Sequence, residues 1–126
     1  MFRPWKFFPI PLNEPDLFTS SSELQKYTAE EPYGLRLATA RFLFSSFSLD
    51  IYLKRAARRS NLPTLLLLGE QDRIISNVET RKFVGRFNTA TSIIDYPGAH
   101  HTLEFEAESH PWIDDVIGWI QRRILA

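Results

Sequence analysis

The stretch that decides the fold is Leu62–Gly69, LPTLLLLG, a short apolar run bounded by proline and glycine. Such a run is typical of a strand that helices cover on both faces. The β-branched segment Ser92–Tyr96, SIIDY, predicts a second strand. Between them, Ser76–Glu79, SNVE, matches the capping box that begins a helix. Strand, helix and strand in this order predict a βαβ unit.

Each of these two predicted strands is followed by a loop that carries a polar side chain capable of chemistry. A βαβ crossover makes its two strands parallel, so their carboxyl ends lie along the same edge of the sheet. The first loop is Gly69–Asp72, GEQD, and the second is Pro97–His101, PGAHH. We therefore expect the side chains of Asp72 and His101 to lie within hydrogen-bond reach of each other.

A carboxylate paired with an imidazole is two-thirds of a catalytic triad. In that arrangement the carboxylate fixes the histidine tautomer and stabilises the imidazolium, while the histidine acts first as general base and then as general acid. Asp72 and His101 are thus the candidate catalytic residues. The third member, a nucleophile, is missing from this pattern.

The remaining histidines and acids of this region suggest structural roles. His100, His101 and Glu104 could be considered as metal ligands, but adjacent histidines seldom bind one ion, and the i, i+4 spacing of zinc proteases is absent. We therefore expect no metal site. His100 is interpreted as a structural loop residue, and His110, which precedes a proline, as a surface residue.

The first 60 residues predict helices and no strand. A first short helix follows the N-cap candidates in Thr19–Glu23 and ends before Pro32. Apolar spacing predicts a second helix over about Gly34–Phe47 and a third that continues from Leu49. The opening, MFRPWKFFPIPL, is rich in proline and predicts an extended arm that packs in a groove. A last helix is predicted near the C-terminus, with a buried stripe formed by Ile113, Val116, Ile117, Ile120 and Ile124.

Composition excludes several classes of function. Fifteen basic and fifteen acidic residues cancel, so no long-range field favours nucleic acid or anionic lipid. The basic cluster of Lys54, Arg55, Arg58 and Arg59 is interpreted as the solvated end of a helix. The opening segment is too short and too rich in proline for a signal peptide or a membrane-spanning helix. The chain contains no cysteine, which fits a cytoplasmic location and excludes a cysteine nucleophile.

Two segments resemble the last part of an α/β-hydrolase: Pro63–Ile75 and Tyr96–Glu104. In that family the acid of the triad lies in a G-x-x-D-x-[IV] turn after a late strand, and the histidine lies in a G-x-x-H loop after the final strand. The resemblance assigns the acid to Asp72 and the base to His101. It places His100 at a variable position.

The upstream half is similar to the helical cap of monoacylglycerol-lipase-like and lysophospholipase-like hydrolases. The similarity lies in Pro9–Leu12, Leu17–Thr19, Glu30–Tyr33 and Ala38–Leu43. It implies an α/β fold with a mainly helical cap over residues 1–60 and the C-terminal part of a doubly wound sheet over 61–126. It also implies a serine hydrolase that cleaves small carboxylic esters without a cofactor. Five aromatic residues either line an acyl-binding groove or pack in the core: Trp5, Phe8, Phe42, Phe44 and Phe47.

The sequence departs from this family at the nucleophile. The elbow G-x-S-x-G is absent, because none of the glycines, at positions 34, 69, 85, 98 and 118, brackets a serine in that pattern. We therefore expect the C-terminal half of a hydrolase that is inactive alone. Two alternatives stay open: another α/β-hydrolase activity, such as an aminopeptidase or a C–C bond hydrolase, and a non-catalytic module that complements a separate N-terminal half.

Overall fold

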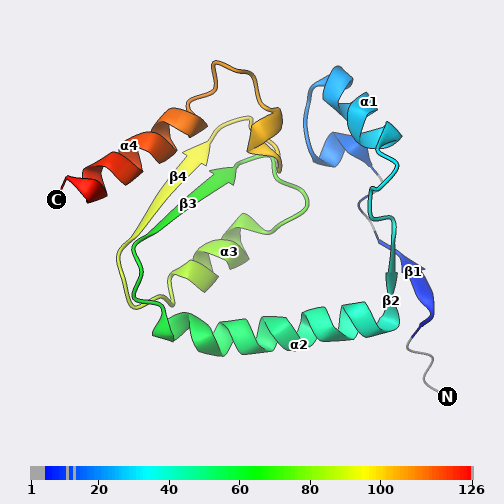
Figure 1. Ribbon diagram of the computed structural model, residues 1–126, viewed down its shortest axis with the longest axis horizontal. Coiled ribbons are helices and arrows are strands. Elements are labelled where there is room, and N and C mark those ends of the chain that lie inside the picture. Colours follow the sequence, from blue (N-terminus) through cyan, green and yellow to red (C-terminus); the bar gives the residue numbers. More distant parts are fainter. Residues whose placement is uncertain (1–4, 11, 13, 126) are drawn as a thin grey trace.

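The computed structural model describes residues 5–10, 12 and 14–125. Short 3-10 helices, named η1 to η3, interrupt a mixture of strands and α-helices (Figure 1). The elements follow one another as β1 (Phe7–Pro9), η1 (Pro15–Leu17), α1 (Ser22–Glu30), β2 (Leu37–Thr39), α2 (Ala40–Ala56), η2 (Ala57–Arg59), β3 (Thr64–Gly69), α3 (Asn77–Val84), β4 (Thr91–Tyr96), η3 (Leu103–Phe105) and α4 (Trp112–Ile124).

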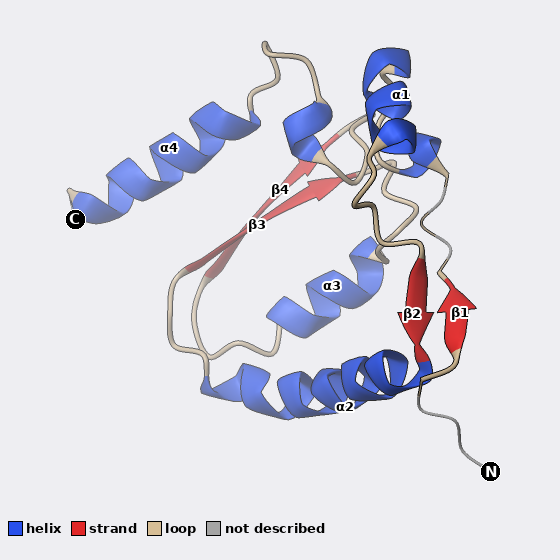
Figure 2. Cartoon of the chain, turned by 45° about the vertical axis from the view of Figure 1, so that its right-hand side comes forward, coloured by secondary structure: helices blue, strands red, loops and turns tan. Residues whose placement is uncertain are grey.

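The expected βαβ unit is confirmed. Strands β3 and β4 are parallel, and their register runs from the pair Thr64 and Thr91 to the pair Gly69 and Tyr96. Figures 1 and 2 show α3 on one side of the strand pair and α4 on the other. Gly69 and Tyr96 are the last residues of their strands and are paired with each other, so the loops that follow both strands leave the sheet at the same edge.

Side-chain hydrogen bonds begin α3 and hold α4 against β4. The Ser76 hydroxyl accepts from the backbone N–H of Glu79 at 3.3 Å, which satisfies one free donor in the first turn of α3. The Tyr96 hydroxyl donates to Asp115 of α4 at 2.8 Å, and the Trp119 indole donates to Ser92 at 3.2 Å. Burial, followed by the bond to Asp115, raises the pKa of Tyr96 far above its ordinary value, so the hydroxyl stays protonated as the donor.

The expected burial is incomplete in β3 and wrong for most of the α4 stripe. Within β3 only Leu68 and Gly69 are fully buried, and the residues before them are partly exposed. The physical reason is the size of the sheet: among the described residues β3 and β4 pair only with each other, so they offer too little apolar surface to cover a helix face. Four residues of the α4 stripe are exposed: Ile113, Ile117, Ile120 and Ile124.

The expectation that the first 60 residues contain no strand is also wrong. Strands β1 and β2 form an antiparallel pair in which Phe7 lies opposite Thr39 and Pro9 opposite Leu37. Strands of three residues are too short to show a period of two, so apolar spacing cannot reveal them. Part of the expected extended arm forms β1, and residues 1–4 and 11 of that arm lie outside the described part. The short helix after Thr19 is confirmed as α1, with the Ser21 hydroxyl accepting from the N–H of Leu24.

Helix α2 replaces the two helices expected after Gly34. The chain is extended through β2, and the helix begins only at Ala40, where the Thr39 hydroxyl caps it by accepting from the N–H of Phe42 at 3.1 Å. It then continues without a break to Ala56. Among the helices in the described ranges, none is both long and apolar enough to cross a membrane.

Contacts of Thr19 and its neighbour dock the N-terminal segment onto the loop after β4. Thr19 is 1% exposed, and its hydroxyl donates to the Phe105 carbonyl at 3.5 Å. The backbone N–H of Thr102 donates to the Phe18 carbonyl at 3.2 Å. These bonds place α1 beside the carboxyl ends of β3 and β4 (Figures 1 and 2). The division into domains at residue 60 stays a prediction.

We expect Gly69→Ala to lower the free energy of unfolding by about 1–3 kcal/mol, the usual cost of overpacking. A Cβ at this position would lie 2.2 Å from the His100 carbonyl oxygen and 2.6 Å from that of Ala99, so backbone must shift. Urea unfolding followed by circular dichroism measures the change.

Gly118→Ala is the matched control for this substitution. Gly118 lies inside α4, and its added Cβ would meet only the flexible Arg122 side chain at 3.4 Å. We expect it to raise the free energy of unfolding by about 0.5–1 kcal/mol, because alanine suits a helix interior better than glycine. Equal stability of Gly69→Ala and the wild type would contradict the close packing of the two loops.

Candidate functional site

The loops that follow β3 and β4 are bonded to each other along their backbones. The N–H of Glu70 donates to the Tyr96 carbonyl at 3.1 Å, and the N–H of Gln71 donates to the Ala99 carbonyl at 2.9 Å. Gly98 has a φ of +80°, a left-handed conformation that residues with a side chain rarely adopt, and it turns the second loop back toward the first. The two loops therefore form one unit whose geometry is set by main-chain contacts.

This unit brings Asp72 and His101 together, as expected from the strand order. The distance between His101 Nδ1 and Asp72 Oδ2 is 2.8 Å. The other carboxylate oxygen, Oδ1, accepts from the N–H groups of Ile74 and Ile75 at 2.8 and 2.9 Å. Both oxygens of Asp72 are thus occupied, and its side chain is only 9% exposed against 29% for His101.

The pKa of Asp72 reflects a competition between burial and hydrogen bonding. Burial alone would raise the pKa, but the bond to His101 and those from the backbone N–H groups of Ile75 and Ile74 outweigh burial and bring the pKa below its ordinary value. Asp72 is therefore ionised near neutral pH and can only accept. The proton of a neutral His101 must then lie on Nδ1, which leaves Nε2 with a free lone pair.

The N-terminal segment supports the His101 ring from the side. The Phe18 ring meets it edge to face, with 6.3 Å between centroids. The Phe18 carbonyl also accepts from the N–H of Thr102. Phe18 therefore contacts both the His101 ring and the backbone of the residue that follows it. Within the described ranges, Nε2 of His101 has no hydrogen-bond partner. The nitrogen that would act as a base is therefore available to another group.

The other two histidines lie apart from this pair and have structural contacts. The backbone N–H of His100 donates to Glu106 Oε1 at 3.0 Å, while its ring Nδ1 is buried without a hydrogen-bond partner, 3.9 Å from the same oxygen. His110 packs edge to face on Tyr96, and its Nδ1 accepts from the N–H of Trp112 at the start of α4. Neither ring joins Asp72 and His101.

Two contacts that hold the site were missed by sequence reasoning. Glu106 holds the backbone of the loop that carries His101, by accepting from the N–H of His100. Arg73 Nη2 donates to Asp16 at 2.5 Å from the carboxylate and 3.1 Å from the carbonyl, which ties the Asp72 turn to η1. The hydrogen bond from Arg73 is the main cause that lowers the pKa of Asp16. No sequence signal connects residues so far apart in the chain.

A largely apolar pocket of about 540 Å³ lies next to the His101 segment, although His101 itself does not line it. Phe18, which contacts the His101 ring, and Thr102, which follows it, both belong to its wall. Glu31 is the one carboxylate that lines it. The apolar part of the wall includes Leu12, Pro15, Tyr27, Leu35 and Phe105.

The aromatic residues expected either in an acyl-binding groove or in the core are in neither place. None of the five lines the pocket beside His101, and all of them are exposed on β1, on α2 or near them. Figure 1 shows that β1 and α2, the elements that carry four of these residues, lie away from the loops that follow β3 and β4. The five residues are Trp5, Phe8, Phe42, Phe44 and Phe47.

Several serine hydroxyls form hydrogen bonds with groups other than His101. Ser21 and Ser76 cap the first turns of α1 and α3, and Ser92 accepts from Trp119. In the described part of the chain, no serine hydroxyl is hydrogen-bonded to His101. Among the described residues, Asp72 and His101 therefore form a carboxylate–imidazole pair to which no serine is bonded.

Comparison with known proteins gives the relatives of this fold and site. A family model described as "Serine aminopeptidase, S33" matches residues 4–108. The crystal structure of a monoacylglycerol lipase from Paleococcus ferrophilus superposes with a TM-score of 0.80 at 21% identity, over 92% of this chain and 46% of the lipase. This chain thus spans less than half the length of that lipase. At such identity the likeness concerns the fold, an α/β-hydrolase fold, whereas the family match extends over most of the sequence. The chain therefore belongs to the serine aminopeptidase S33 family of α/β-hydrolases.

Proposed function

We propose that this chain supplies the acid and the base of a serine hydrolase that cleaves small carboxylic esters. One observation carries the proposal: His101 Nδ1 lies 2.8 Å from Asp72 Oδ2 at the carboxyl edge of a parallel strand pair. Ligands of open α/β sheets bind at that edge. Asp72 is the proposed acid, and His101 is the proposed base.

In the proposed reaction a serine from a segment outside this sequence attacks the ester carbonyl. His101 Nε2 takes the proton of the serine hydroxyl as the new C–O bond forms, and then delivers it to the departing alkoxide, which leaves as the alcohol. Water then attacks the acyl-serine by the same proton transfers and releases the acid. Ionised Asp72 keeps the proton on Nδ1 and stabilises the imidazolium. The serine and the oxyanion hole come from the same outside segment, and the reaction needs no cofactor.

The surface left open by β3 supports the need for such a segment. One edge of β3 has no strand beside it in the described structure, and four isoleucines of α4 are exposed. Additional strands at that edge would extend the sheet and cover apolar side chains. We propose that the segment either precedes this sequence in one polypeptide or is a separate N-terminal half.

The pocket beside His101 supports an ester with an apolar acyl group. Its apolar wall suits a hydrocarbon chain, and its volume falls in the range of about 300–1,000 Å³ that is common for ligand sites. The likeness to a monoacylglycerol lipase supports the same substrate class. The acyl chain would lie along Phe18, which brings the carbonyl near His101.

An aminopeptidase activity is the second candidate, because the matching family is described as a serine aminopeptidase. Recognition of a free substrate amine requires a carboxylate near the reacting carbonyl. Glu31 is the carboxylate that lines the pocket, and its Oε1 already accepts from the N–H of Tyr33 at 3.1 Å. The ester is favoured because the rest of the pocket wall is largely apolar.

The first test adds the missing segment. We expect the reading frame upstream of the Met1 codon to encode a G-x-S-x-G elbow, and the extended chain to hydrolyse p-nitrophenyl butyrate. His101→Ala should lower kcat by roughly 10⁶-fold and Asp72→Asn by about 10⁴-fold, as in other triads. His110→Ala, the control, should stay within about twofold, since its ring lies outside the site.

The isolated 126-residue chain should give no turnover above that of its His101→Ala variant. Turnover by the isolated chain that His101→Ala abolishes would contradict the need for an outside serine. An upstream frame without a serine elbow, together with no separate half that restores activity on mixing, would contradict the proposed reaction.

The second test separates the ester from the peptide substrate. With the extended chain, we expect Glu31→Gln to leave ester turnover within about twofold, because an acyl chain forms no charged contact with Glu31. We expect no hydrolysis of alanine p-nitroanilide. Hydrolysis of the anilide with a KM that rises about tenfold or more in Glu31→Gln would instead establish the aminopeptidase, since a bond to a charged amine would be lost.

The third test uses the pH dependence of stability. The pKa of Asp72 is lowered by folding, so its stabilising contribution is complete above the ordinary value of 3.8 and is lost as pH falls through the lower folded value. We expect the difference in free energy of unfolding between the wild type and Asp72→Asn to shrink below about pH 4. Urea unfolding of both chains at a series of pH values measures it. A difference that stays constant down to about pH 2 would contradict the lowered pKa.

A further inference from the structure

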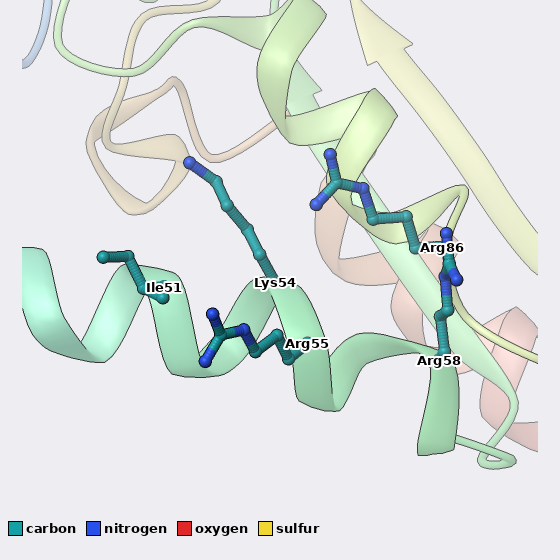
Figure 3. Close-up of a pocket in the computed structure, with 5 residues that line it drawn as sticks. All are labelled: Ile51, Lys54, Arg55, Arg58 and Arg86. Carbon is teal, nitrogen blue, oxygen red and sulfur yellow. The ribbon is translucent and has the colours of Figure 1, made fainter.

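A second pocket lies at the opposite end of the strand pair from Asp72 and His101. Its volume is about 550 Å³, and Figure 3 shows the side chains that line it. The C-terminal end of α2 lies by the amino ends of β3 and β4, whereas the loops that carry Asp72 and His101 follow their carboxyl ends (Figure 1). We call this site the basic pocket, and its lining residues are Ile51, Lys54, Arg55, Arg58 and Arg86.

The positive charge of the basic pocket is only partly compensated. Lys54 is paired with Asp50 at 2.6 Å. Among the described residues, Arg55, Arg58 and Arg86 form no ion pair. The field of the cluster reaches a nearby acid: the pKa of Glu79 is lowered first by its bond to Lys82 and more weakly by the charges of Lys54 and Arg86. Three guanidinium groups therefore remain available to an anion.

The helix dipole explains part of the cluster and leaves Arg86 unexplained. Lys54 and Arg55 lie in the last turn of α2, where cations are favourable. Arg86 comes from the turn after α3. Two hydrogen bonds of Asn88 hold that turn against the connection from η2 to β3: its N–H donates to the Ser60 carbonyl at 2.9 Å, and its amide donates to Asn61 at 3.1 Å. Long-range contacts thus bring an additional cation to the pocket.

We propose that the basic pocket binds the phosphoryl group of a small molecule. A phosphoryl group carries up to two negative charges and several acceptor oxygens, and guanidinium groups bind such oxygens with paired N–H donors. The side chains surround a hollow large enough for a small ligand, and Ile51 provides apolar contact for the part without charge. The proposal does not depend on the hydrolase reaction, since it concerns the other end of the sheet.

The test is calorimetric titration of the 126-residue chain with inorganic pyrophosphate at fixed ionic strength. We expect saturable binding, which Arg58→Gln with Arg86→Gln weakens by at least about tenfold, because each charge-assisted bond contributes on the order of a tenfold factor. Arg58→Lys with Arg86→Lys keeps the charge and should bind with intermediate affinity. This second pair separates loss of binding from loss of structure.

The matched control removes two positive charges elsewhere. Lys26 forms an exposed pair with Glu30 on α1, and Arg122 lies at the end of α4. Lys26→Gln with Arg122→Gln changes the net charge by the same amount and should leave binding within about twofold of the wild type. An equal loss in this control would show a nonspecific charge effect and would overturn the proposal.

The source of the phosphoryl group is identified with vesicles. Phosphatidate in phosphatidylcholine vesicles is compared with pyrophosphate in solution, and pure phosphatidylcholine is the blank. Binding of pyrophosphate that depends on Arg58 and Arg86 supports a soluble phosphorylated ligand. Binding of phosphatidate alone, with the same dependence, supports the proposal with a lipid headgroup as the source. Binding of neither, or binding that the double glutamine variant retains, overturns the proposal.

Discussion

The site depends on the parallel pairing of β3 with β4, in which the two strands end at the same point of the register. Gly69 and Tyr96 are paired at the end of the register, so both following loops begin at the same height. The absence of a side chain at Gly69 then lets the two loop backbones approach within hydrogen-bond distance. These main-chain contacts position Asp72 and His101 next to each other. The side-chain pair is therefore a consequence of backbone geometry more than a cause of it.

The parts of the structure that sequence reasoning predicted are those with local patterns. The apolar run before Gly69, the cap at Ser76 and the last helix each leave a signal within a few residues. The approach of Asp72 to His101 followed because strand order alone determines which loops are neighbours. The catalytic assignment of the two residues stays a prediction.

The parts that sequence reasoning missed depend on contacts between distant residues or on elements too short for a period. Strands β1 and β2 have three residues each and pair across more than twenty residues of chain. The bonds from Arg73 to Asp16 and from Thr102 to Phe18 join segments that have no common pattern. Phe18 and Thr102, which one of these bonds joins, belong to the wall of the pocket beside His101, so that wall could not be inferred from aromatic composition.

The apolar stripe of α4 has the sequence pattern of a buried helix face, but its burial needs more structure than the described strands provide. Isoleucines spaced for one helix face indicate a surface that water should not reach, yet the two-stranded sheet leaves most of them exposed. A stripe of this kind is stabilising only when something covers it. Covering this stripe would take more sheet than the two described strands, which agrees with the proposal that an outside segment supplies the serine.

The net charge of zero does not reveal that the two ends of the strand pair differ in local charge. Balanced totals of acidic and basic residues exclude a strong field over the whole molecule, and this was the basis for interpreting the cluster around Lys54 as a solvated helix end. The fold then adds Arg86 to that cluster from another element, while the pocket beside His101 stays largely apolar. Local charge is a property of how the chain folds, so a neutral composition excludes steering of a polyanion but leaves room for a site that holds a single phosphoryl group.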